Sequence, residues 1–236
     1  MRSEFINGIK TFAPVTTKDL IEYAFEKKSI LIAINAEKIL KSNEASTIII
    51  NQNIGYPDGI GALLALKKKG VKNAIKIPGC ELWLDIIRIK EKEKKFYLIG
   101  GKQDVIESTV TKLKSEYTNL DIVNYRNGYI QTEEEIIQLE EDILNKKPDV
   151  IFVAMGSPKQ EILMSRLQVK HAAVYQGLGG SFDLYIGNVK RAPQWWMKIF
   201  KWEGLYRSLS DFTNIERWKR QRIVFRFIWK LCTNQI

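Results

Sequence analysis

Cysteine and histidine are scarce in this chain of 236 residues, which contains two cysteines and one histidine. Cys80 and Cys232 lie far apart and belong to no metal-binding or redox motif, so we expect both to be reduced thiols. His171 has no cysteine or histidine partner and is expected to be an ordinary loop or sheet-edge residue. Because the sequence has no Asp-x-Asp pair either, a nucleotide-sugar site of the carboxylate–metal type is not expected. We therefore expect neither a metal nor a cofactor.

Long apolar runs are also missing. No stretch approaches the roughly 18 uncharged apolar residues of a membrane-spanning helix. Residues 1–5 lack the apolar core of a signal peptide, so we expect the protein in the cytoplasm. The hydrophobic content of 45% and the charged content of 27% are typical of a globular protein.

Positive charge is concentrated near the C-terminus. The chain has 37 Lys and Arg against 27 Asp and Glu, a net charge of +10. Residues 185–236 hold 11 Lys and Arg against 3 acidic residues, or +8, which leaves +2 for residues 1–184. The same segment contains five of the six tryptophans. This composition predicts a nearly neutral domain, residues 1–184, followed by a basic, Trp-rich appendage, residues 185–236.

The first of these two parts alternates apolar runs with amphipathic segments. The runs predict strands at 29–34, 48–50, 96–101, 120–125, 150–155 and 172–175. The amphipathic segments predict helices at 15–25, 62–69, 81–89, 105–117 and 133–145, with a short helix starting at 35. Such alternation favours an α/β fold with a mostly parallel sheet and helices on both faces.

The segment Tyr56-Pro57-Asp58-Gly59-Ile60-Gly61 joins the apolar run 46–51 to the expected helix 62–69. A junction of strand, loop and helix is where open α/β sheets place their ligands. Asp58 then has two interpretations. It could be the N-cap of the following helix, because Asp is favoured there and complements the helix dipole, or it could take part in chemistry at the crevice.

Three further loops could bind a nucleotide. In residues 156–161 a strand ends in glycine, Ser157 is expected to cap a helix that starts with Pro158, and the free amides could bind phosphate or a uracil edge. Gln160 and Glu161 are expected to project toward the crevice. Residues 177–183 are glycine-rich and could approach a sugar or diphosphate, and 96–101 resembles a nucleotide-binding turn. The alternatives are a capped helix start, a loop with positive φ angles and a plain tight turn.

Seven motifs occur in a fixed order along the chain. They are Asn35-Ala36-Glu37, Pro57-Asp58-Gly59-Ile60-Gly61, Pro78-Gly79, Gly156-Ser157-Pro158-Lys159-Gln160-Glu161, Gly179-Gly180-Ser181-Phe182-Asp183, Arg191-Ala192-Pro193 and Trp202-Glu203-Gly204-Leu205-Tyr206-Arg207. Together they resemble the WecG/TagA/CpsF family of bacterial glycosyltransferases over residues 5–222. The resemblance implies a Rossmann-like α/β catalytic domain with a C-terminal appendage.

The resemblance also implies an activity. The family is thought to transfer a sugar from a UDP-sugar to a polyprenyl-diphosphate-linked sugar at the inner face of the cytoplasmic membrane, in the synthesis of cell-surface polysaccharide. Transfer is thought to proceed with inversion and without a metal. The general base of the family corresponds to Asp58, which would take the proton of the acceptor hydroxyl.

Further site residues follow from the same resemblance. Donor-substrate contacts are expected from Asn35, Lys76, Gly156, Ser157, Gln160, Glu161, Gly179, Asp183 and Arg191. Contacts with the acceptor diphosphate or the membrane are expected from Arg207, Arg217, Arg220 and Arg222. Two positions depart from the family pattern, with Ala33 where a threonine is common and Lys76 where an arginine is common. Lysine keeps the positive charge but lacks the two-pronged geometry of arginine.

The appendage interleaves aromatic residues with cations, as an interfacial membrane helix does. The alternatives are an amphipathic helix packed on the core, one in the interface of a homo-oligomer, or a nucleic-acid-binding tail without a recognisable motif. Two functions therefore compete with the glycosyltransferase. One is a non-catalytic nucleotide- or nucleic-acid-binding protein, and the other is a membrane-surface scaffold that has lost activity.

Overall fold

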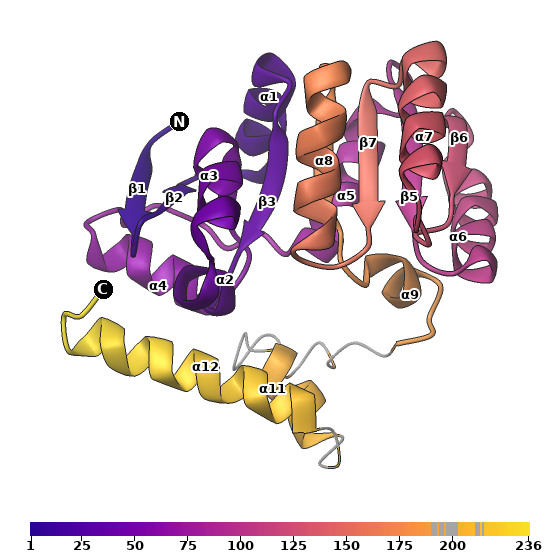
Figure 1. Cartoon of the computed structure of the whole chain (residues 1–236). Helices are drawn as coiled ribbons and strands as arrows, with labels where there is room; N and C mark the ends of the chain where they lie inside the picture. Colours follow the sequence, from indigo (N-terminus) through magenta and orange to yellow (C-terminus); the bar gives the residue numbers. More distant parts are fainter. Residues whose placement is uncertain (190–192, 194–195, 197–202, 211–212, 214) are drawn as a thin grey trace.

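A six-stranded parallel sheet forms the centre of the molecule, in the order β4-β3-β8-β7-β5-β6 (Figure 1). The computed structural model describes residues 1–189, 193, 196, 203–210, 213 and 215–236. The strands of this sheet are β3 (Ile30–Ile34), β4 (Ile54–Pro57), β5 (Lys95–Gly100), β6 (Asp121–Arg126), β7 (Val150–Ala154) and β8 (Val174–Gly177). The predicted α/β class and parallel sheet are confirmed.

Helices cover both faces of the sheet. They are α1 (Thr17–Lys27), α2 (Ala36–Lys41), α3 (Glu44–Gln52), α4 (Ile60–Lys68), α5 (Gly79–Lys90), α6 (Gln103–Glu116), α7 (Glu133–Lys146), α8 (Lys159–Lys170) and α9 (Ser181–Tyr185). Two more, α11 (Glu203–Leu209) and α12 (Ile215–Cys232), lie in the C-terminal segment.

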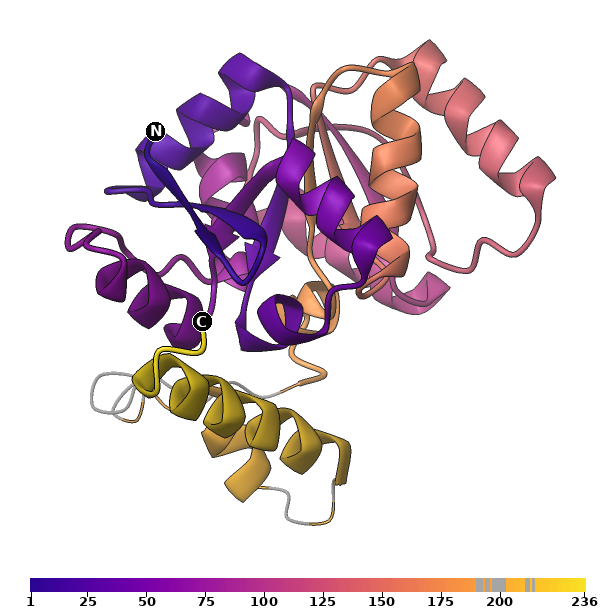
Figure 2. The same cartoon turned by 60° about the vertical axis from the view of Figure 1, so that its left-hand side comes forward.

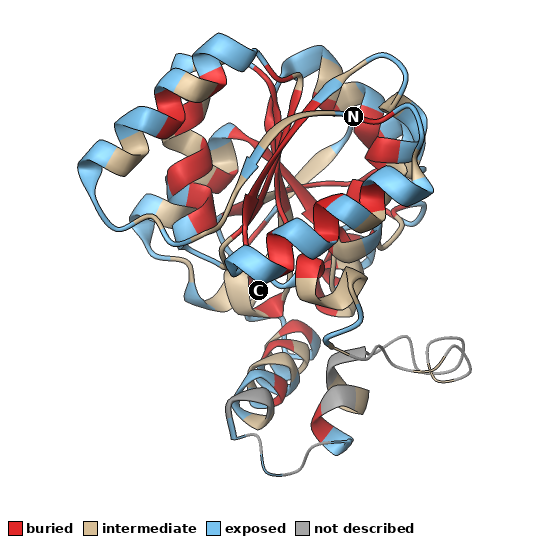
Figure 3. Ribbon diagram, turned by 90° about the vertical axis from the view of Figure 1, so that its right-hand side faces the viewer, coloured by how far each residue is buried: buried red, intermediate tan, exposed pale blue. Residues whose placement is uncertain are grey.

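The strands sort their side chains by alternation into two apolar layers. In β3, Ile30, Ile32 and Ile34 belong to the apolar cluster that includes residues of α2, α3, α7 and α8, whereas Leu31 belongs to the cluster on the other face, with residues of α1, α5 and α6. The same alternation divides β5 and β7, since successive residues of a strand point to opposite faces. Figure 3 shows the buried strands enclosed by helices whose outer sides are exposed. Continuous apolar runs are therefore the correct signal for these strands.

The strand predicted at 48–50 is wrong, because these residues belong to helix α3. Asn43 caps that helix, its side chain accepting from the N–H of Ser46, and Ile50 packs in the core while Ile48 is half exposed. The strand that precedes the Asp58 loop is β4, residues 54–57. In β4 the backbone passes so close to its neighbours that a Cβ on Gly55 would lie 2.7 Å from the Lys10 carbonyl oxygen.

A two-stranded antiparallel hairpin, β1 (Ser3–Ile6) and β2 (Ile9–Phe12), precedes the sheet and was not predicted. Its turn is Asn7-Gly8, and both residues have positive φ angles, 49° and 79°. Asn-Gly is the dipeptide most typical of a two-residue hairpin turn. The signal was therefore present in the sequence.

The C-terminal helix α12 lies across α2 and α4, below the carboxyl edge of the sheet (Figures 1 and 2). Phe227 and Leu231 are buried in the same core as Ala36 and Ala62. The Lys68 ammonium also donates to the backbone carbonyl of Leu231. The predicted C-terminal helix is present. One of its faces packs on the core, as the alternative of an amphipathic helix packed on the core predicts. No helix within the described residues is long and apolar enough to cross a membrane.

Candidate active site

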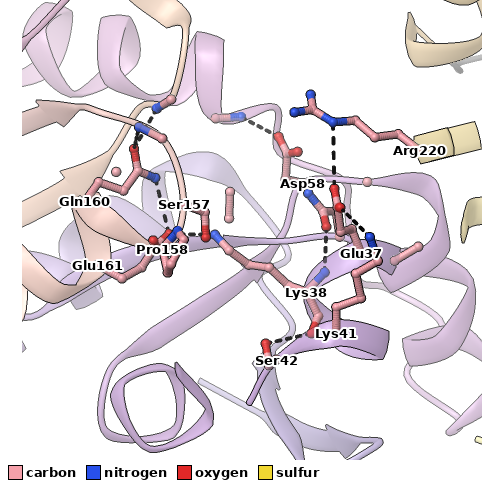
Figure 4. Close-up of a pocket in the computed structure, with 18 of the residues that line it drawn as sticks. Glu37, Lys38, Lys41, Ser42, Asp58, Ser157, Pro158, Gln160, Glu161 and Arg220 are labelled. Carbon is pink, nitrogen blue, oxygen red and sulfur yellow. Dashed lines mark hydrogen bonds and ion pairs between the residues drawn. The ribbon is translucent and has the colours of Figure 1, made fainter. Parts of the chain in front are cut away.

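A cavity of about 790 Å³ opens where β3, β4, β7 and β8 end (Figure 4). Each of these strands is followed by residues that line it: 35–38 after β3, 58–61 after β4, 156–158 after β7 and 178–181 after β8. Helix α12 contributes Arg220, Gln221 and Val224 to the opposite wall. The carboxyl ends of parallel strands are the expected place for a ligand in such a sheet.

Asp58 lies in this cavity, in the turn between β4 and α4. Its backbone N–H donates to the carbonyl of Ile34, which ties the turn to the end of β3. The N–H of Gly79 donates to the Asp58 carboxylate oxygen Oδ1 at 2.7 Å. The N-cap of α4 is Gly59 and has no side-chain hydrogen bond. Asp58 therefore does not cap its own helix, and its carboxylate instead meets the first N–H of α5, where the helix dipole favours negative charge.

Asn35 also has a structural partner. Its side-chain oxygen accepts from the N–H of Lys38 at 3.0 Å and caps α2. A Cβ on Gly59 would lie 3.3 Å from the Cβ of Asn35, so the Asp58 turn packs closely on the start of α2. Asn35 and Asp58 thus follow adjacent strands and lie side by side at the cavity.

The side chain of Gln160 joins two glycine loops. Its Oε1 accepts from the N–H of Gly156 at 3.2 Å and from the N–H of Gly179 at 2.9 Å. These two amides are therefore occupied and not available to a phosphate. The predicted cap is also wrong, because the N-cap of α8 is Pro158 and no side chain caps the helix. Ser157 precedes it through a cis peptide bond and lines the cavity.

Glu161 and Lys38 form a buried ion pair in the wall of the cavity, with Nζ 2.7 Å from Oε1. The side chains are 5% and 14% exposed, respectively, and Gln160 Nε2 donates to the same oxygen at 3.2 Å. Burial alone would raise the pKa of Glu161, but the charge of Lys38 and the hydrogen bonds from Lys38 and Gln160 outweigh it, and the pKa is lowered. Glu161 is thus ionised at neutral pH.

The family model described as "Glycosyl transferase WecG/TagA/CpsF family" matches residues 7–236. The chain belongs to this family. As a WecG/TagA/CpsF glycosyltransferase, it falls in a family involved in cell-surface polysaccharide synthesis. The described residues include no group of three or more His, Cys, Asp or Glu side chains arranged to hold a metal ion.

Most of the residues that the family resemblance singles out come together in the cavity. Those that line it are Asn35, Asp58, Lys76, Gly156, Ser157, Gln160, Glu161, Gly179 and Arg220. Asp183 and Arg222 are not among the lining residues. Asp183 lies in α9, where its carboxylate accepts from Asn188, and Arg222 is exposed on α12. Arg191 and the side chains of Arg207 and Arg217 fall outside the described residues. The roles of all these residues stay predictions.

Other lining residues were not foreseen. Lys38, Lys41 and Gln221 line the cavity of this glycosyltransferase, as does Cys80 in the first turn of α5. Lys38 carried a usable signal, since it stands three residues after a predicted helix start whose first turn should face the crevice. Residues 96–101 do not appear among the lining residues. The N–H of Gly101 donates to the Ala154 carbonyl at 3.1 Å, which continues the pairing of β5 with β7.

Proposed function

We propose that this glycosyltransferase moves a sugar from a UDP-sugar to a polyprenyl-diphosphate-linked sugar, with inversion and without a metal, and that Asp58 is the general base. The observation that carries the proposal is the position of the Asp58 carboxylate, in the cavity and held at Oδ1 by the Gly79 N–H. The Gly79 N–H occupies one acceptor site of this carboxylate, and a carboxylate has about four.

In the proposed reaction the acceptor hydroxyl gives its proton to the Asp58 carboxylate as its oxygen attacks C1 of the donor sugar. The bond between C1 and the β-phosphate oxygen breaks on the opposite side, and its electron pair leaves with UDP. One C–O bond forms and one breaks, and because the attack comes from the face opposite the departing oxygen, the configuration at C1 is inverted. The proton ends on Asp58 and is later released to solvent.

Departure of UDP places growing negative charge on the diphosphate, and fixed cations would stabilise it. Lys38, Lys41, Lys76 and Arg220 line the cavity. Arg220 Nε lies 4.0 Å from the Glu37 carboxylate, with its side chain largely exposed, so a diphosphate could compete for it. We assign Arg191, Arg207 and Arg217 to the same task on the family resemblance alone.

We further propose that residues 185–236 bring the catalytic domain, residues 1–184, to the inner face of the cytoplasmic membrane. The two sides of α12 support this assignment. One side carries Phe227 and Leu231 into the core, and the other exposes Arg222, Phe225, Arg226 and Trp229. Exposed tryptophan beside cations is typical of a helix lying in the headgroup region of an anionic membrane.

A transfer assay tests this function directly. The purified chain is incubated with a panel of UDP-sugars and a short-chain lipid-diphosphate-GlcNAc analogue, in the presence of EDTA. We expect one UDP-sugar to release UDP and yield a product whose new glycosidic bond, read by NMR, has the opposite anomeric configuration. Transfer from no UDP-sugar, a retained configuration, or loss of transfer in EDTA would each contradict the corresponding part of the proposal.

A further inference from the structure

We propose that Gln176 is a positioning residue for the reaction, which holds the first turn of α5 so that Gly79 can hold the carboxylate of Asp58. Gln176 lies on β8, near the middle of the sheet, and is linked to the Asp58 carboxylate through Gly79. The inference rests on the proposed function, because it assumes that Asp58 is the base.

Gly79 connects the two side chains through its own peptide groups. Gln176 Nε2 donates to the Gly79 carbonyl at 3.1 Å, and the Gly79 N–H donates to Asp58 Oδ1 at 2.7 Å. The same Nε2 lies 3.4 Å from the hydroxyl oxygen of Tyr56. Three segments that are distant in sequence therefore meet at one glycine: the end of β4, the start of α5 and the middle of β8.

The first turn of α5 lies too close to β4 for any other residue at position 79. A Cβ on Gly79 would lie 2.9 Å from the Tyr56 hydroxyl oxygen and 3.7 Å from Asp58 Oδ1. Tyr56 itself is fully buried, and burial, with a contribution from the charge of Asp58, raises its pKa well above the ordinary value. Tyr56 is therefore neutral at neutral pH, and its buried hydroxyl packs against the first turn of α5.

The burial of Gln176 is the second argument. The side chain is 0% exposed, yet its oxygen Oε1 has no hydrogen-bond partner among the residues that the structure describes. A buried amide with an unpartnered oxygen lowers stability, and an apolar side chain of similar shape would avoid that loss. The stability of the core therefore does not account for a glutamine at this position. The hydrogen bond from Nε2 to the Gly79 carbonyl, in the first turn of α5, does account for a glutamine.

Gln176→Met tests the proposal, because methionine fills a similar volume and donates no hydrogen bond. Tyr175→Phe is the matched control, since it removes a side-chain hydrogen bond on the same strand, from Tyr175 to the His171 carbonyl. Turnover and UDP affinity are measured for both. In addition, the amide resonance of Gly79 is followed by NMR across a pH titration, since its shift reports the ionisation of the carboxylate that it contacts.

For Gln176→Met we expect a fold as stable as the wild type or more so, a kcat reduced about tenfold or more, and an unchanged Kd for UDP. We also expect the titration at the Gly79 amide to move to higher pH, because a looser N–H stabilises the carboxylate less. The other charged or titratable groups on this side of the cavity, Glu37, Tyr56, Lys76, Cys80 and Arg220, are unchanged in the variant. Tyr175→Phe should alter neither kcat nor the titration.

Three results would overturn the inference: an unchanged kcat, an unchanged Gly79 titration, or a Gln176→Met chain that fails to fold, which would make the residue structural. The titration needs no turnover, so it tests the contact between Gln176, Gly79 and Asp58 separately from the reaction. An active Asp58→Asn enzyme would remove the proposed base. A normal Gln176→Met enzyme beside an inactive Asp58→Asn enzyme would remove only the positioning role.

Discussion

Phe227 of α12 packs directly against Gly61, in the first turn of α4 and three residues after Asp58. A Cβ on Gly61 would lie 3.1 Å from Cδ1 and Cε1 of the Phe227 ring. Phe227 is 0% exposed and shares its core with residues of α2 and α4. The C-terminal helix is therefore anchored at the start of α4, next to the Asp58 turn. The residues one and two turns earlier on α12, Arg220, Gln221 and Val224, form a wall of the cavity.

Truncating this anchor should release the helix. We expect Phe227→Ala to lower the free energy of unfolding by about 3–5 kcal/mol, the usual result for removing a fully buried phenylalanine. Phe225→Ala is the control, because Phe225 is 53% exposed on the same helix and should cost much less. Urea unfolding of both variants measures the difference. Equal losses in the two variants would show that α12 is not anchored through Phe227.

The ion pair between Lys38 and Glu161 gives a second prediction. Lys38→Met should destabilise the protein by about 3–5 kcal/mol, because it leaves a buried carboxylate without its cation. Adding Glu161→Gln to that variant should restore much of the loss, since neither buried charge then remains. A double-mutant cycle in urea measures the coupling. Simple additivity of the two single changes would contradict the pairing.

The same pair has a predictable pH dependence. The pKa of Glu161 is lowered in the folded protein, so its contribution to stability is present above the ordinary value of 4.5 and is lost as pH falls below it. In Lys38→Met the unpaired buried carboxylate should have a raised pKa, and the sign reverses. Stability of that variant should then increase as acid protonates Glu161. Thermal unfolding between pH 4 and pH 7 distinguishes the two behaviours, with wild type as reference.

Gln160 should matter for binding through the two loops that it joins. Gln160→Met leaves the N–H groups of Gly156 and Gly179 without their common acceptor. We expect the affinity for UDP to fall about tenfold, the equivalent of one lost hydrogen bond of ordinary net strength. Gln168→Met, on the same helix but bonded to the distant Lys28 carbonyl, is the control. Calorimetric titration with UDP compares the variants, and equal affinities would exclude the loops from the nucleotide site.

The outward side of α12 should determine membrane binding. Arg226→Gln combined with Trp229→Ser should weaken co-sedimentation with phosphatidylglycerol vesicles, since each cation near such a surface adds about 1 kcal/mol. Val169→Ser removes an apolar side chain that is 84% exposed on α8 and serves as the control. If the control weakens binding as much as the double variant does, the membrane-facing side of the molecule has been misassigned.

The sequence predicts the fold well where one physical rule dominates. Strands β3, β5 and β7 are buried on both faces, so each is a continuous apolar run. Strand β4 is not a continuous apolar run, because close backbone contacts require Gly55 and the strand ends at Pro57. The isoleucines of α3 were mistaken for a strand because short apolar runs of this kind have no period that distinguishes a strand from a helix.

The residues of the site also divide into those that the sequence predicts and those that it does not. Asp58 could be placed because a turn after a parallel strand must lie at the carboxyl edge of the sheet. The contact between Asp58 and Gly79 could not be predicted, since this contact depends on how the chain returns to that edge at the start of α5. Gln176 was missed for a similar reason: it lies 97 residues beyond its partner Gly79, and β8 reaches it only through the order of strands in the sheet.

The most direct measurement is the turnover of Asp58→Asn beside its affinity for UDP. Asparagine keeps the side-chain oxygen that accepts from Gly79 but cannot take a proton, so the loop should remain in place. We predict a kcat reduced about 10²–10⁴-fold, the usual contribution of a general base, with the Kd for UDP within about twofold of wild type. Asp104→Asn, an exposed aspartate in α6, should behave as wild type. An Asp58→Asn enzyme that turns over at the normal rate would contradict the proposed mechanism.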